Sequence, residues 1–111
     1  MTNSITYIFL ETHNWGKTVK FWQQMGYEVD LDLGTSGRML NAAGGPALFI
    51  TEVPEDHVPT TQIAVRTDED GWKPESPVEV TKDWHDSHWG TQIMKIKDPD
   101  GRDMLVQLNG D

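Results

Sequence analysis

Strict alternation of apolar and polar residues marks the clearest β-strand of the chain. In the segment "YEVDLDL", residues 27–33, every second residue is apolar and every residue between is acidic. Successive side chains of a strand point to opposite faces of its sheet. This segment therefore predicts a strand with one packed face and one acidic, solvated face.

A helical period precedes that strand. Between residues 15 and 25 the apolar positions recur three, four and seven residues apart, beginning at Trp15. Asn14 is a favourable residue to begin the helix, and Gly26 is a favourable residue to end it. We expect Phe21 and Trp22 on this helix to belong to the core.

Seven further segments have strand character, being rich in β-branched and aromatic residues or alternating in polarity. They cover residues 5–12, 38–43, 47–53, 61–67, 78–86, 91–97 and 103–109. The order is β-α-β-β-β, a linker with two prolines at 54–60, and then β-loop-β-β-β. The second half repeats the first without its helix, which is a weak internal repeat of element order.

Length and composition are those of one folded domain. The chain has 111 residues, 36% of them hydrophobic, with five Trp, three Phe and two Tyr. The absence of Cys excludes disulfides, thiolate metal sites and cysteine nucleophiles. No apolar stretch is long enough to span a membrane, and the N-terminal segment is not typical of a signal peptide. We therefore expect a cytoplasmic protein that does not bind membranes.

The formal net charge of −9 argues against nucleic acid as a partner, since proteins that bind phosphate backbones carry basic patches. It favours neutral or cationic ligands, because an acidic surface attracts positive charge. Acidic proteins are also common simply because charge keeps them soluble.

Two segments carry a family resemblance. "KTVKFWQQMGYEV", after the first strand, and "WGTQIMKIKDPDGRDMLVQL", at residues 89–108, resemble motifs of the vicinal oxygen chelate superfamily, the glyoxalase, bleomycin-resistance and dioxygenase group. The resemblance covers nearly the whole chain. It implies an α+β fold of two βαβββ-type modules that form a curved mixed sheet, and here the second module lacks its helix. We expect a single domain, 1–111, with module one at 1–53, a linker at 54–60 and module two at 61–111.

The closest-looking branch is that of the bleomycin-resistance proteins. The resemblance implies a non-enzymatic homodimer that sequesters an antibiotic in clefts shared between its subunits. Superfamily enzymes instead hold a divalent metal on three strands, at positions that correspond here to Tyr7, Gln62 and Leu105. Leu cannot ligate a metal, a neutral Tyr is a poor ligand and Gln alone is weak. We therefore expect no metal, no cofactor and no catalytic residues.

Strand alternation checks the register of these positions. If Leu105 faces the concave side of the sheet, Met104 and Val106 face the packed side, and both are apolar as that side requires. Likewise Tyr7 and Phe9 share one face of their strand. If the register were wrong by one residue, every side chain of these strands would point to the opposite face of the sheet.

A different metal site has little support. His85 and His88 are three residues apart, a spacing that could serve one metal on a helix, but their segment is a strand end or loop. His13 and His57 each stand alone near a turn. The serines have no nucleophile-elbow context, and the glycines at 44–45 are better explained by a hairpin turn than by a phosphate loop.

Without a metal, the concave face would be a wall for a flat organic ligand, aromatic or cationic, because aromatic rings stack on planar rings and attract cations. The candidate ligand-binding residues are Tyr7, Phe9, Phe49, Thr51, Gln62, Ala64, Arg66, Trp84, Trp89, Leu105 and Gln107.

The missing helix predicts a dimer. Without it the back of module two would expose Ile63, Val65, Met104 and Val106, a patch for another subunit to bury. Two other functions remain open. One is a metal-dependent glyoxalase- or dioxygenase-like enzyme with a non-standard site, and the other is a binding or scaffolding module whose cleft is filled by its own aromatic residues. The sequence identifies neither the ligand nor any residual activity.

Overall fold

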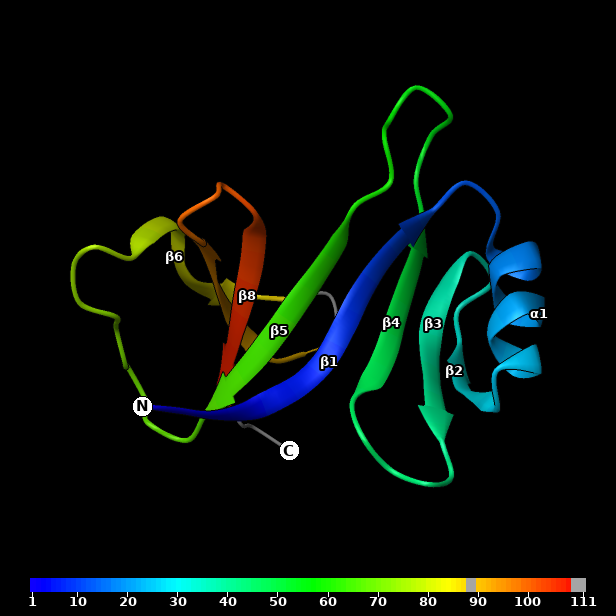
Figure 1. Ribbon diagram of the computed structural model, residues 1–111, viewed down its shortest axis with the longest axis horizontal. Helices are drawn as coiled ribbons and strands as arrows, with labels where there is room; N and C mark the ends of the chain where they lie inside the picture. Colours follow the sequence, from blue (N-terminus) through cyan, green and yellow to red (C-terminus); the bar gives the residue numbers. More distant parts are fainter. Residues whose placement is uncertain (88–89, 109–111) are drawn as a thin grey trace. The chain divides into compact units, whose positions relative to one another are not determined.

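The computed structural model describes residues 1–87 and 90–108. This part of the chain contains one α-helix, α1 (Trp15–Gln24), between the first and second strands (Figure 1). The strands are β1 (Thr2–Thr12), β2 (Tyr27–Asp32), β3 (Ser36–Asn41), β4 (Ala47–Glu52), β5 (Thr61–Thr67), β6 (Glu79–Asp86), β7 (Gln92–Lys97) and β8 (Asp103–Leu108). Every predicted element is present, with bounds shifted by a few residues at most.

The chain divides into two compact units, which we call the helical unit and the helix-free unit. The helical unit is Tyr7–Thr61, and the helix-free unit is Met1–Thr6 together with the residues from Gln62 onward. Side chains fasten the first residues within the helix-free unit. Thr67 donates from Oγ1 to the carbonyl of Met1 at 3.0 Å, and Asn3 donates to Asp68 at 2.7 Å.

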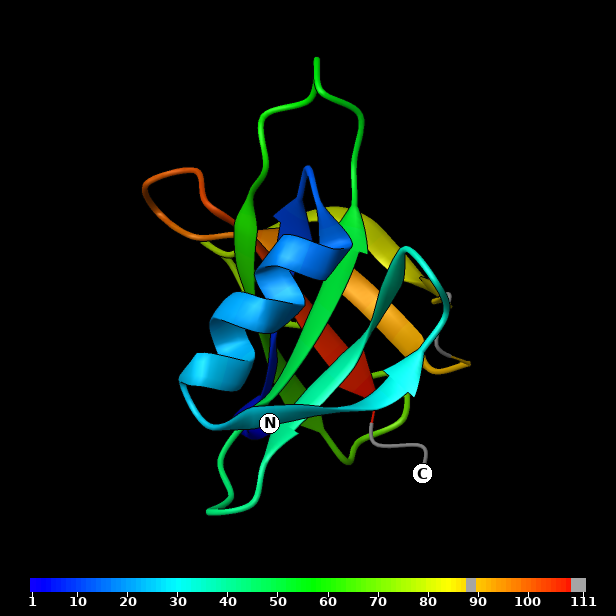
Figure 2. The same ribbon diagram turned by 90° about the vertical axis from the view of Figure 1, so that its right-hand side faces the viewer.

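The helical unit is a sheet with the strand order β2-β3-β4-β1, and α1 lies across one of its faces (Figure 2). β1 and β4 are parallel, whereas β2, β3 and β4 are antiparallel neighbours. A parallel pair needs a crossover connection, and here the connection from β1 to β4 contains α1 and the two strands that follow it.

α1 begins and ends where the sequence predicted. The Asn14 side chain accepts a hydrogen bond from the backbone N–H of Lys17 at 2.9 Å, which satisfies a donor of the first turn. Gly26 follows the helix with φ 97°, a left-handed conformation that glycine adopts without steric strain.

The core of the helical unit lies between α1 and the sheet. Trp15, Met39, Leu48 and Ile50 are buried there, and Trp22 packs against them as expected. Close packing requires Gly37, because a Cβ at this position would come within 2.7 Å of the Trp15 ring and 2.1 Å of a backbone oxygen. The expectation that Phe21 belongs to the core was wrong: the side chain is 56% exposed, because only one face of a helix on a sheet can be buried.

The helix-free unit repeats the same strand order without a helix. Its order is β6-β7-β8-β5, with β5 and β8 parallel and the other neighbours antiparallel. The segment from Asp68 to Val78, which would hold the second helix, is a loop. The α+β class, the mixed pairing of strands and the missing second helix are therefore confirmed.

The back of this unit is better buried than expected. Val106 was predicted to be exposed but is fully buried, as is Met94 beside it on β7. β8 is flanked on both sides, so Val65 and Met94 are the cross-strand neighbours of Val106. Val65 and Met104 are half-buried, and Ile63, at 39% exposure, is the exposed member of the predicted patch.

No helix in the described ranges has the length and apolar character needed to cross a membrane.

Candidate functional site

The face of the helical unit that points away from α1 carries four of the predicted ligand-binding residues. Phe9 is paired with Phe49 and Glu11 with Thr51 across β1 and β4, so these side chains share a face with Tyr7. Ile8 and Leu10 point the other way and pack under α1. The predicted register of the first strand is confirmed.

An aromatic and charged array occupies this face. The rings of Tyr7 and Phe49 meet edge to face with centroids 4.6 Å apart, and the guanidinium of Arg38 lies 5.8 Å from the centre of the Phe49 ring. Arg38 is held in a fork: Nε donates to Asp30 Oδ1 at 2.9 Å and a terminal nitrogen donates to Oδ2 at 2.6 Å. Asp30 therefore fixes a cation over an aromatic ring.

Burial differs along this array. Tyr7 and Phe49 are 2% and 8% exposed, whereas Phe9 and Thr51 are half-buried and the Arg38 side chain is 40% exposed. A ligand on this face would contact Phe9, Thr51 and Arg38 directly, with the two buried rings beneath.

At one end of the same face, Glu11 fastens the segment between β4 and β5. Its Oε1 accepts hydrogen bonds from His57 Nε2 at 2.8 Å, from the backbone N–H of Thr60 at 3.0 Å and from the Thr60 hydroxyl at 2.8 Å. His13 donates from Nε2 to the carbonyl of His57 at 2.7 Å. Burial alone would raise the pKa of Glu11, but the hydrogen bonds from Thr60 and His57 outweigh it and leave the pKa below its usual 4.5.

Five more predicted residues share one face of the helix-free unit. Ala64 is paired with Leu105 and Arg66 with Gln107 across β5 and β8, and Gln62 lies two residues before Ala64 on the same side. Ala64 and Leu105 are 0% and 5% exposed, so they form the floor of this face.

Polar groups surround that floor. Thr91 donates from Oγ1 to Gln107 Oε1 at 3.2 Å and shares a 2.9 Å hydrogen bond with the Ser87 hydroxyl. Gln107 thus accepts through its oxygen. Within residues 1–87 and 90–108, nothing accepts a hydrogen bond from its amide nitrogen.

Arg66 is incompletely paired. Its one acidic partner in the described ranges is Asp68, reached by a terminal nitrogen at 3.5 Å. Its Nε is buried and has no hydrogen-bond partner among those residues. A buried donor left without an acceptor costs about 1–3 kcal/mol.

Trp84 is held by its own unit. Its indole Nε1 donates to the carbonyl of Trp72 at 2.8 Å, which ties β6 to the loop that replaces the second helix. Both rings are half-buried. Trp89, which was also predicted to contact ligand, and His88 lie outside the described residues.

The residues at the three expected metal positions do not fit a divalent cation. Leu105 has no donor atom and packs beside Ala64. Burial raises the pKa of Tyr7 to about 12, so its phenol keeps its proton at neutral pH. Gln62 has a neutral amide oxygen, and a site for Zn²⁺ or Fe²⁺ needs three or more converging donors.

Elsewhere the described residues form no group of three or more His, Asp or Glu side chains suited to a metal. His85 uses its Nδ1–H to donate to the carbonyl of Asp83 at 2.8 Å. A carbonyl can only accept, so Nδ1 carries the hydrogen of this bond.

Sequence reasoning missed Arg38 and Asp30. Asp30 was interpreted mainly as part of a solvated acidic strand face, with acid–base chemistry as the less favoured alternative. The signal was available in the predicted hairpin, because antiparallel pairing of residues 27–33 with 38–43 brings an arginine close to an acidic row.

No family model matches the chain, and no curated protein is significantly similar to it in sequence. Several solved structures are similar in fold. A bleomycin resistance determinant encoded on the transposon Tn5 is 13% identical, with a TM-score of 0.43 over 98% of this chain and 100% of its own. A bleomycin-binding protein solved with bleomycin is 14% identical, with a TM-score of 0.40 and the same two coverages.

A glyoxalase/bleomycin resistance/dioxygenase superfamily member from Sphaerobacter thermophilus is also 14% identical, with a TM-score of 0.40 over 96% of this chain and 98% of its own.

Proposed function

We propose that this protein binds and sequesters a small aromatic compound without changing it chemically. The observation that carries the proposal is the array on the helical unit, in which Asp30 holds Arg38 over the ring of Phe49. Fixed aromatic and polar groups of this kind orient planar ligands. A packed core alone does not need an arginine held in a fork above an aromatic ring.

Binding is favoured over catalysis by the state of the polar groups on that face. The half-buried carboxylate of Glu11 already accepts three hydrogen bonds and has a lowered pKa, so it is a poor general base. Tyr7 keeps its proton at neutral pH and cannot act as a base either.

The resemblance to bleomycin-resistance proteins supports the same function and extends it. It implies that the bound compound is toxic, such as an antibiotic, and that the protein works as a homodimer in the cytoplasm. The net charge of −9 attracts cations from a distance, but local charges decide which ligand fits at contact.

The proposal is tested with three naphthalene compounds of similar size and different charge: a naphthylmethyl ammonium, a naphthyl methanol and a naphthoate. Binding is measured by calorimetry and by quenching of Trp fluorescence. We expect at least one compound to bind, and Phe9→Leu to weaken it about tenfold through loss of ring stacking.

Phe21→Leu on the outer face of α1 is the matched control and should bind like the natural sequence. Failure of all three compounds to bind would overturn the proposal.

The second candidate, a metal-dependent enzyme with a non-standard site, predicts tight metal binding. The purified protein is exposed to Zn²⁺, Ni²⁺, Mn²⁺ and Fe²⁺, the excess is removed, and metal content is measured. We expect less than about 0.1 ion per chain, because the donor set does not fit. One tightly held ion per chain would favour the enzyme, with His85→Ala and His88→Ala as the next variants.

A further inference from the structure

Two lysines stand directly opposite each other in the helix-free unit. Lys82 on β6 and Lys95 on β7 are cross-strand partners, at a place where the register between the two strands shifts on both sides of Lys82. Neither has an acidic partner among residues 1–87 and 90–108. Like charges directly opposite each other destabilise a sheet, so this pairing needs a reason.

Lys97 has the acidic partner that Lys82 and Lys95 lack. It lies two residues after Lys95 on the same face of β7, and its cross-strand partner is Asp103. The two side chains form an ion pair at 2.8 Å, and this hydrogen bond raises the pKa of Lys97. Lys95, by contrast, stands beside Leu105 on one side and Lys82 on the other.

Protection of the sheet edge explains only one of these lysines. β6 is an edge strand of this unit, and lysines on edge strands discourage pairing with other chains. Lys95 lies on β7, which has a neighbouring strand on each side, so edge protection does not account for it.

Further polar side chains lie on the same face, in the neighbouring row of cross-strand partners. That row consists of Arg66, Gln107, Ile93 and His85, and it lies beside the row of Ala64, Leu105, Lys95 and Lys82. Arg66 has a buried Nε without a hydrogen-bond partner among the described residues, and Lys82 and Lys95 have no acidic partner there. An anion would supply the missing acceptors.

The acidic groups close to this face are already engaged. Asp68 contacts Arg66, and Asp103 forms an ion pair with Lys97. On the other side of Lys97, its cross-strand partner is Glu79. Asp83 on β6 pairs with Lys73. Asp86 on β6 accepts a hydrogen bond from the neutral side chain of Gln92. Lys82 and Lys95 therefore remain without an acidic partner among the described residues.

We propose that this face of the helix-free unit, centred on Lys82 and Lys95 with Arg66 and Gln107 beside them, binds the anionic group of a small organic acid. A carboxylate or phosphate ester would accept from the ammonium groups and the guanidinium, and charge-assisted hydrogen bonds of this kind are the strong ones. The inference goes beyond the proposed function, because it assigns a second site, for a small organic acid, that lies within the helix-free unit alone.

The test compares Lys82→Gln/Lys95→Gln with Lys17→Gln/Lys20→Gln. Both double variants remove two lysine charges that have no described acidic partner, but Lys17 and Lys20 lie on α1. Calorimetry is carried out with the three naphthalene compounds named above, which are the naphthoate, the naphthyl methanol and the naphthylmethyl ammonium. Naphthyl phosphate is added as a second anion.

We expect the two anions to bind more tightly than the other compounds and to lose about tenfold or more in affinity in the Lys82/Lys95 variant, as loss of one charge-assisted contact predicts. The Lys17/Lys20 variant should bind like the natural sequence. The melting temperature of the Lys82/Lys95 variant should stay the same or rise, because a repulsion has been removed. A purely structural role would lower it.

Equal affinity for the anionic, neutral and cationic compounds, or an equal loss in both double variants, would overturn this inference and leave the proposed function standing. Failure of every compound to bind would overturn the proposed function itself. The relative affinities of naphthoate and naphthyl phosphate show whether the preferred acid is a carboxylate or a phosphate.

Discussion

The helical unit and the helix-free unit have the same strand order and differ in what accompanies it. Both place the first strand parallel to the fourth and join the others as antiparallel neighbours. One buries its sheet under α1, where Trp15 fills the core, and the other has a loop in the place of a helix. The pairing pattern is therefore independent of the helix.

The two units also differ in the partners of the cationic side chains on their sheets. In the helical unit, Arg38 donates two hydrogen bonds to the carboxylate of Asp30. In the helix-free unit, Lys82 faces Lys95 across two strands. Arg38 is therefore held in one position by its own unit before any ligand binds, whereas Lys82 and Lys95 have no acidic partner among the described residues. The two proposed sites differ in how their cations are positioned.

The largest expected effect is on the helical core. Trp15→Ala removes an 8% exposed ring between α1 and the sheet and should lower the free energy of unfolding by about 3–5 kcal/mol. Phe21→Ala, on the exposed side of the same helix, should change it by less than about 1 kcal/mol. Urea denaturation followed by circular dichroism measures both, and equal losses would contradict the assigned orientation of α1.

Met94→Ala tests whether the helix-free unit has a comparable core. Met94 is fully buried beside Val106, so we expect a loss of about 2–5 kcal/mol in the free energy of unfolding. Met25→Ala is the matched control, because Met25 is 54% exposed and should contribute about 0.5 kcal/mol or less. A loss below about 1 kcal/mol for Met94→Ala would show that this unit is poorly packed without a helix.

A smaller effect is expected for acid stability. The pKa of Glu11 is lower in the folded chain than its usual 4.5, so its stabilisation is present above that value and is lost as pH falls through the lower, folded value. Glu11→Gln should therefore be less stable than the natural sequence at pH 6, by roughly 1 kcal/mol or less, and the two should converge near pH 3. Denaturant titrations between pH 3 and 6 measure the difference, and a constant gap across this range would contradict the account.

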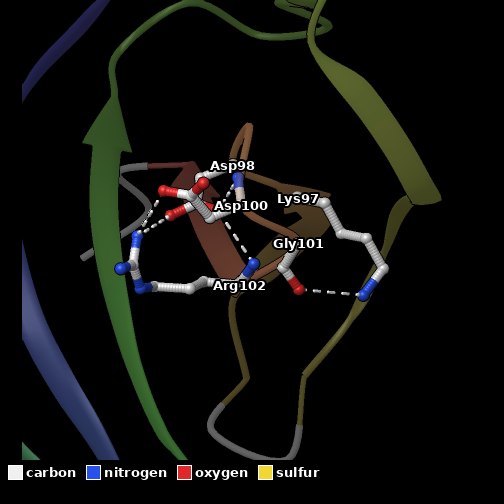
Figure 3. Close-up of polar contacts among 5 residues, drawn as sticks. All are labelled: Lys97, Asp98, Asp100, Gly101 and Arg102. Atoms are coloured by element: carbon white, nitrogen blue, oxygen red, sulfur yellow. Dashed lines mark hydrogen bonds and ion pairs between the residues drawn. The ribbon is translucent and has the colours of Figure 1, made fainter.

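The corresponding comparison in the helix-free unit is Asp98. Its oxygens accept from the side chain of Arg102 and from the backbone N–H groups of Asp100 and Arg102 (Figure 3), and these bonds hold its pKa below 3.8. Asp98 lies on an exposed turn, where water screens its charge interactions. Asp98→Asn should therefore show a weaker pH dependence than Glu11→Gln, and an equal or stronger one in the same titrations would contradict this comparison.

Local patterns predicted the elements of this chain well. The alternation in residues 27–33 and the helical period from Trp15 need only neighbouring residues to be read, and Asn14 caps the helix as predicted. The face shared by Tyr7 and Phe9 was also correct, because alternation along one strand fixes its two faces.

Features that depend on pairing between distant segments were not predicted. The opposition of Lys82 and Lys95 follows from a register that shifts on both sides of Lys82, and alternation does not reveal such shifts. The burial of Val106 depends on neighbours on two other strands. The exposure of Phe21 depends on which part of the broad apolar face of α1 packs against the sheet.

The central claim, that the protein holds an aromatic compound without transforming it, is tested most directly by recovering what it binds. The protein is incubated for hours with the tightest-binding naphthalene compound, separated from free compound and denatured, and the released compound is identified and counted by mass spectrometry. The account predicts stoichiometric recovery of unchanged compound, with no dependence on added divalent metal. Release of a converted product, or binding that requires the metal, would contradict it.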